Sequence, residues 1–94
     1  MIIKNNDQLV MRFGAGDICV AGGYTKHEDG LKTGFVIFTN DEPGEIGRPG
    51  TIKAGEVDLN DYPVVMVFDK KESIDVVIEA LEKTKALLSN PKSV

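Results

Sequence analysis

The sequence contains only one cysteine, Cys19, and one histidine, His27, in 94 residues. A single cysteine excludes a disulfide within the chain, which is typical of a reducing compartment. Metal sites need several Cys, His or carboxylate ligands that converge, and this pair cannot supply them. Cys19 stands between apolar neighbours in a predicted strand, where free cysteine usually acts as a small buried hydrophobic residue. We therefore expect no metal and no cofactor.

The chain also lacks long apolar segments and an excess of positive charge. Its longest uninterrupted apolar run, Val64 to Phe68, has five residues, whereas a membrane-spanning helix needs about 20. The first residues lack the charged start and apolar centre of a secretory signal, so we expect a cytoplasmic protein. The net charge of −4 argues against a nucleic-acid surface and against binding to an anionic membrane.

Short apolar segments alternate with turn-forming residues through the first two thirds of the chain. A chain of this length suits one domain, 1–94, with a modest core. The run that follows Pro63 is continuous and rich in β-branched residues, which predicts a central strand. Two long glycine-rich loops are expected at 22–30 and 40–50. Alternation and turn chemistry predict strands at 1–4, 8–13, 17–21, 33–39 and 64–68, with a further short one within 51–59.

The residues after 68 predict one long helix. Asp69 and Glu72 have the spacing of a capping box, and Asn90-Pro91 is a natural stop. We therefore predict an α+β fold, in which a small antiparallel β-sheet of about four to six short strands carries one C-terminal α-helix, about 71–89, across one face.

The apolar residues of this helix form two stripes at about 100° per residue. The weaker stripe indicates either a wide core-facing surface or a helix-to-helix contact in a dimer. The main stripe, which should face the sheet, comprises Ile74, Val77, Ile78, Leu81 and Leu88, and the weaker stripe comprises Val76, Ala80 and Leu87.

Arg48 is the most informative candidate for a binding residue. It stands between Gly47 and Pro49-Gly50, and glycine-rich loops expose backbone N–H groups that can bind anions. A guanidinium is suited to planar, bidentate capture of phosphate or carboxylate. The alternative is that Arg48 pairs with Glu45 or Asp41 and only holds the loop in place.

The loop at 22–30 carries a second group of polar candidates, Tyr24, Lys26 and His27. If these residues lie near Arg48 in space, the two loops could hold a small phosphate-bearing ligand. Paired carboxylates in open loops are usually only solvated, whereas acid–base catalysis needs them in a shaped, partly dry site. We therefore do not expect an enzyme.

Two hypotheses for function follow. The first is a non-enzymatic binding or regulatory protein, an inhibitor or adaptor of the kind found in phages and bacteria. It would contact a protein partner through its glycine-rich loops and its helix. The second is a homo-oligomer, a homodimer or larger, that captures a small anionic, nucleotide-like ligand with loops 22–30 and 40–50. The candidate binding residues are Tyr24, Lys26, His27, Glu45, Ile46 and Arg48.

Overall fold

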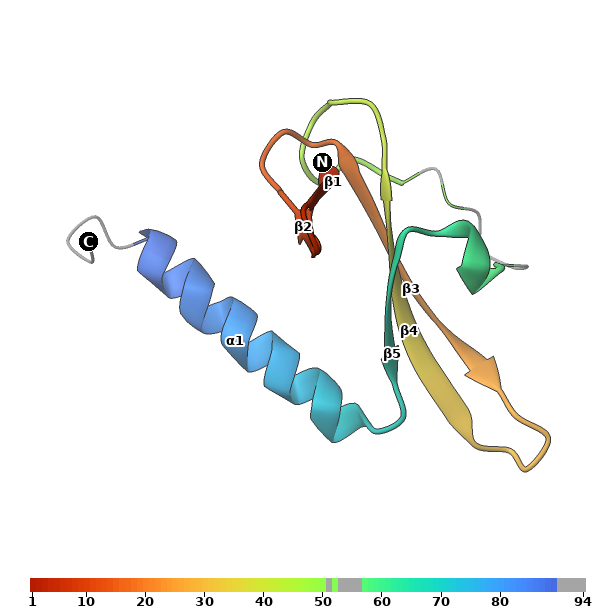
Figure 1. Cartoon of the computed structure of the whole chain (residues 1–94). Coiled ribbons are helices and arrows are strands. Elements are labelled where there is room, and N and C mark those ends of the chain that lie inside the picture. The colour runs from red at the N-terminus through yellow and green to blue at the C-terminus, as the bar shows by residue number, and fades with distance from the viewer. Residues whose placement is uncertain (51, 53–56, 90–94) are drawn as a thin grey trace.

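The computed structural model of the chain describes residues 1–50, 52 and 57–89 (Figure 1). Two antiparallel sheets and one C-terminal helix make up this part of the chain, which confirms the predicted α+β class. The elements are β1 (Ile2–Asn5), β2 (Gln8–Met11), β3 (Ile18–Lys26), β4 (Lys32–Asn40), the 3₁₀ turn η1 (Leu59–Asp61), β5 (Val64–Phe68) and α1 (Lys71–Ser89).

The strands are divided between a hairpin and a larger sheet. β1 and β2 pair only with each other, through a turn at which Asn6 adopts a positive φ of 56°. The other three strands follow the order β3-β4-β5. β4 is therefore central, as its apolar residues on both faces predict. The prediction that 64–68 is central was wrong, because a continuous apolar run reports burial on both faces rather than a partner strand on both edges.

β3 is longer than the sequence predicts. It pairs with β4 from Ile18↔Asn40 to Lys26↔Lys32, so Gly22 and Gly23 lie inside the strand rather than in a loop. The ring of Phe35, opposite Gly23, fills the space that a side chain would occupy, since a Cβ at Gly23 would lie 2.7 Å from its Cζ. The connection between β3 and β4 is therefore a tight turn, in which the His27 N–H donates to the Leu31 carbonyl over 2.8 Å.

The expected strand within 51–59 falls largely on residues 51 and 53–56, which lie outside the described ranges. Leu59, the last residue of that range, begins η1 instead of ending a strand. The Asp58 carboxylate accepts a hydrogen bond from the Asn60 N–H over 2.9 Å, which caps this turn. η1 leads the chain back to β5.

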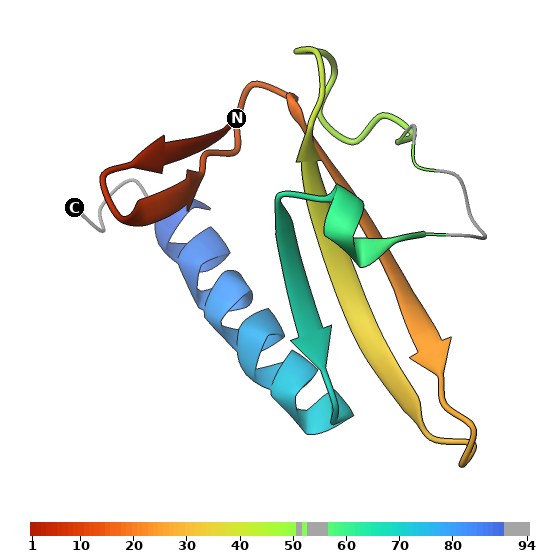
Figure 2. The same cartoon turned by 45° about the vertical axis from the view of Figure 1, so that its right-hand side comes forward.

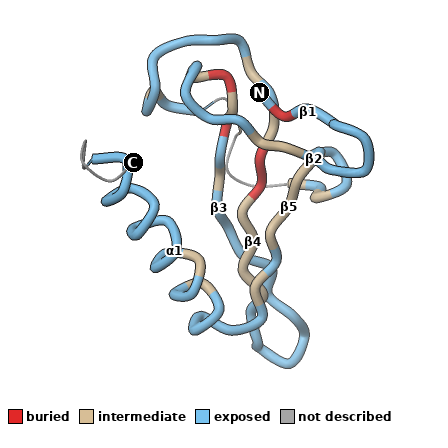
Figure 3. Tube along the Cα trace, turned by 60° about the vertical axis from the view of Figure 1, so that its left-hand side comes forward, coloured by how far each residue is buried: buried red, intermediate tan, exposed pale blue. Residues whose placement is uncertain are grey.

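The core is small and centred on β4. Ile37 is fully buried on one face of the three-stranded sheet, and Phe38 is buried on the other. Phe13 packs edge-on against Phe38 with ring centroids 6.2 Å apart. Cys19 and Ile2 complete the buried apolar residues of the part described, and Figure 3 shows how few red segments the trace contains.

Helix α1 begins and ends where the sequence predicts, from Lys71 to Ser89. It lies on the same side of the three-stranded sheet as the β1–β2 hairpin, whereas η1 lies on the other side (Figures 1 and 2). The helix meets the sheet at its first turns, along β5, and then diverges from it (Figure 3). Only Ile74 and Val77 of the main stripe are half-buried, and no residue of α1 is fully buried.

Candidate functional site

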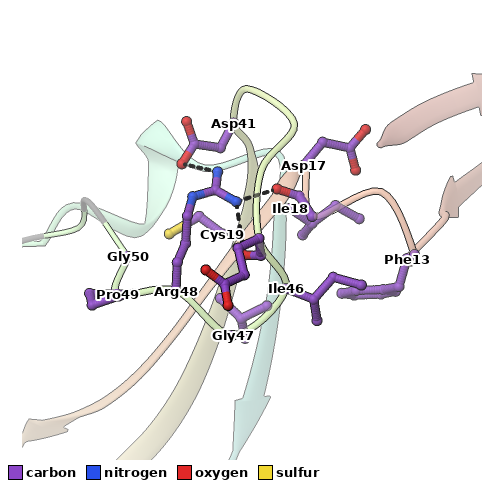
Figure 4. A pocket seen from close by; sticks show the side chains of 14 residues that line it. Phe13, Asp17, Ile18, Cys19, Asp41, Ile46, Gly47, Arg48, Pro49 and Gly50 are labelled. Atoms are coloured by element: carbon purple, nitrogen blue, oxygen red, sulfur yellow. Dashed lines mark hydrogen bonds and ion pairs between the residues drawn. The ribbon is translucent and has the colours of Figure 1, made fainter.

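Three surfaces need to be considered as binding sites. Two carry the candidate binding residues predicted from the sequence, and the third exposes apolar residues. These surfaces are the pocket beneath loop 40–50, the far end of the β3–β4 hairpin, and the apolar side of α1. The pocket has a volume of about 300 Å³ and lies where the loop folds back over the start of β3 (Figure 4). It is lined by apolar residues from β3 and the preceding segment, with Ile46 and Arg48 from the loop.

The Arg48 guanidinium spans this pocket and is held by oxygen atoms on several sides (Figure 4). Nη1 donates to the carbonyl oxygens of Gly16, over 2.6 Å, and Glu45, over 3.3 Å. Nη2 donates to the carbonyl oxygen of Glu42, over 2.6 Å, and to Asp41 Oδ2, over 3.4 Å. Both terminal nitrogens are therefore engaged within the chain, and an external anion would have to displace these acceptors.

The glycines around Arg48 permit close contact between two segments of backbone. A side chain at Gly16, which has a φ of 68°, would overlap the carbonyl oxygen of Gly44. A Cβ at Gly44 would lie 2.6 Å from Arg48 Nη1. Gly44 is thus explained by packing of the loop against Gly16 and against the guanidinium, whereas Gly47 has a φ of 90° that favours glycine. This geometry favours the interpretation in which Arg48 holds the loop in place.

Cys19 is buried beneath the same loop. A Cβ added at Gly50 would lie 2.9 Å from its sulfur, so the loop backbone covers the thiol closely. A nucleophilic thiol must be reachable by its substrate, and this one contacts the core instead. The expectation that Cys19 is a small buried residue is confirmed.

Tyr24, Lys26 and His27 lie at the opposite end of the β3–β4 hairpin from Arg48. Lys26 pairs with Lys32 at one end of the ladder, and Ile18 pairs with Asn40 beside loop 40–50 at the other. Eight residues of strand separate these ends by about 26 Å. The condition that the two groups lie close together is therefore not met within one chain, because β3 extends through residues that were expected to form the loop.

The residues at the hairpin end are partnered among themselves. Lys32 Nζ lies 4.6 Å from the centroid of the Tyr24 ring, in a cation–π contact. His27 Nε2 lies 2.7 Å from Thr33 Oγ1, and this hydroxyl donates to Asp69 Oδ1 over 3.5 Å. Apart from the half-buried Thr33, these residues are solvent-exposed. The contacts connect the hairpin end to the start of α1 and enclose no dry site of the kind that acid–base catalysis requires.

The apolar side of α1 is the largest feature that the internal contacts leave unexplained. Past Val77, its main stripe is open to solvent: Ile78 is 45% exposed, Leu81 63% and Leu88 84%. Val76 and Leu87 of the weaker stripe are exposed as well. We call Ile78, Leu81 and Leu88, the exposed part of the main stripe, the α1 face. The sequence identified these residues as part of an apolar stripe, but periodicity alone could not show that the sheet leaves them uncovered.

Other kinds of site are limited by the composition of the described residues. Within residues 1–50, 52 and 57–89, no group of three or more His, Cys, Asp or Glu side chains could hold a metal ion. In the same ranges, no helix is long and apolar enough to cross a membrane. Comparisons of the chain with protein-family models, with curated proteins and with solved structures give no match, so the candidate surfaces rest on their own geometry.

Proposed function

We propose that this protein is a non-catalytic binding protein whose docking surface for another polypeptide is the α1 face. The observation that carries the proposal is the exposure of three large aliphatic side chains in one stripe of α1, each at 45% or more. Single exposed apolar residues are normal on soluble proteins. Three such side chains aligned on one side of a helix are different, because contiguous exposed apolar area is typical of interaction sites.

The energetics favour a protein rather than a small ligand at this surface. Complete burial of one Val, Leu or Ile side chain is worth about 1.5–3 kcal/mol. The α1 face offers several such side chains along a rod, which a groove or a second helix could cover together. The opposite side of α1 is charged and carries the Glu79–Lys83 ion pair, at 3.2 Å, so it stays in water when the apolar side is covered.

The glycine-rich loop serves the proposed interaction as a rigid frame. Arg48 fastens the loop to the carbonyl oxygen of Gly16 and closes it on the carbonyl oxygen of its own Glu42. The loop presents Ile46, which is 71% exposed, as an isolated apolar contact. Binding through the helix and this loop would act by occupying the surface of a partner, as an inhibitor or adaptor does. None of these steps needs a reacting group on this chain.

Photo-crosslinking at matched positions tests the proposal. A photoreactive amino acid would replace Leu81 on the α1 face or Glu79 on the charged side, in cells that produce the protein. We expect a discrete protein adduct from position 81 and none from position 79. Ile78→Asp in the same chain should abolish the adduct, whereas Glu82→Gln should not. Equal crosslinking from both positions, or none from position 81, would contradict the proposal.

A further inference from the structure

We infer that the occupant of the α1 face is a second copy of this chain. In this arrangement two α1 helices pack antiparallel across a two-fold axis that passes beside Leu81. The inference rests on the proposed function, since it identifies the partner of the same surface. Two kinds of observation point to it: the open shape of the chain, seen in its exposed area and its dimensions, and the self-complementary pattern of α1.

The area exposed by one chain is too large for a closed monomer. The accessible surface is 7883 Å² for a 10.2 kDa chain, whereas a folded monomer of this mass exposes about 5,300 Å². Even if the ten residues outside the described ranges supplied about 1,000 Å² of this difference, roughly 1,600 Å² would remain. A standard interface buries about 800 Å² on each partner. One chain therefore has enough surplus surface for a dimer contact.

The open shape of the chain accounts for this surplus of exposed surface. Its radius of gyration is 15.4 Å and its longest extent is 51 Å, whereas a compact chain of this length has a radius of gyration of about 12 Å. Figures 1 and 3 show α1 diverging from the three-stranded sheet rather than lying along it. The exposed apolar residues after Val77 lie on the part of α1 that diverges from the sheet.

The sequence of α1 is complementary to itself when the second copy runs in the opposite direction. Ile74, Leu81 and Leu88 recur every seven residues, the spacing of one of the two apolar positions that face a partner helix in a heptad repeat. With Leu81 beside the axis, it meets its own copy, and Ile74 of one chain faces Leu88 of the other. Such an isologous contact needs one patch only, and it closes after two chains.

The charges on α1 favour the antiparallel direction over the parallel one. The first half of the helix carries Lys71 and the acids Glu72, Asp75 and Glu79, a net charge of −2, and the second half carries Glu82, Lys83 and Lys85, a net charge of +1. Antiparallel packing brings the acidic half of each helix beside the basic half of the other. Parallel packing would place like charges together and opposes association.

The oligomeric state of matched variants tests the inference. Light scattering and native mass spectrometry of the wild-type chain should give twice the 10.2 kDa chain mass. Leu81→Asp should raise the dimer Kd at least about 100-fold, because two carboxylates then meet beside the axis. Glu82→Gln, one residue away on the charged side, should leave the Kd unchanged. Retained helical circular dichroism in Leu81→Asp would show that the variant still folds.

Engineered cysteines test the direction of packing independently of stability. In a Cys19→Ala background, Leu81→Cys should form a disulfide-linked dimer on oxidation. Leu88→Cys alone should not, because its expected neighbour is Ile74 of the other chain. A linked Leu88→Cys dimer would indicate parallel helices and overturn the proposed geometry.

The two proposals fail in different ways. A wild-type chain that remains monomeric at about 100 μM would overturn the second copy as the partner. In that case, an adduct at position 81 with a different protein would still support the proposed function. A monomer with no adduct at position 81, and with slow amide exchange along all of α1, would overturn both, because the helix would then be covered by its own chain.

Discussion

Arg48 illustrates how one side chain can organise a loop without contacting a ligand. Its guanidinium is planar and carries donors on separate nitrogens, so it can satisfy carbonyl oxygens from Gly16 and Glu42 at the same time. A lysine ammonium on a flexible stem cannot reproduce this fork. The side chain is 33% exposed, so these hydrogen bonds form partly in the presence of water and each contributes a modest amount.

Replacement of Arg48 should therefore destabilise the fold. We expect Arg48→Ala to lower the free energy of unfolding by about 1–2 kcal/mol, and Arg48→Lys to recover only part of the loss. Urea denaturation followed by circular dichroism would measure both. Lys26→Ala, a change to a solvated side chain at the far end of the hairpin, serves as the control and should have little effect. Unchanged stability together with lost phosphate binding would instead favour capture of a small anion by Arg48.

The sequence could indicate Arg48 and its carboxylate partner Asp41, but it could not indicate the carbonyl oxygens. A charged side chain between glycines stands out in the residue pattern, and nearby acids are its obvious partners. Backbone acceptors depend on the path of the loop, and the close approach of Gly16 to Gly44 sets that path. The sequence left two alternatives for Arg48, capture of an anion or holding the loop in place, and the tertiary contacts of the loop favour the second.

At the scale of elements, the helix was the easiest to predict, because long periodicity and a proline stop gave the bounds of α1. Apolar residues on both faces fit the central position of β4, but the continuous apolar run at 64–68 was wrongly expected to be central. β3 was cut short because glycines at positions 22 and 23 were interpreted as loop residues. Their place in the strand depends on the Phe35 ring across the ladder, a non-local contact that local composition does not contain.

Amide exchange should reflect the unequal burial of these elements. We expect the slowest exchange in β4 around Ile37 and Phe38, which lie in the core. In α1, residues from Ile78 onward should exchange faster as the protein is diluted, because dilution separates the two copies. Exchange in β4 should not respond to the same dilution while the chain stays folded. Exchange along α1 that is slow and independent of concentration would contradict the dimer.

At the scale of the whole molecule, the small core has a consequence for stability. The core of the described residues consists of a few side chains around β4, and a chain of this size gains only a marginal surplus from its own burial. A contact through α1 would add apolar burial that the single chain lacks. Folding and association would then be linked, since a partner that binds only the folded form stabilises it by mass action.

This linkage predicts that thermal stability depends on protein concentration. For a dimer that unfolds to two separate chains, each tenfold increase in concentration adds about 1.4 kcal/mol per dimer. Shared between two chains of this size, that corresponds to a rise in Tm of about 3–5 °C. Differential scanning calorimetry over a hundredfold range of concentration would measure it, with Leu81→Asp as the variant whose Tm should stay constant. A wild-type Tm that does not change across this range means that folding needs no second copy, and the exposed α1 face would then have to be covered by a different protein.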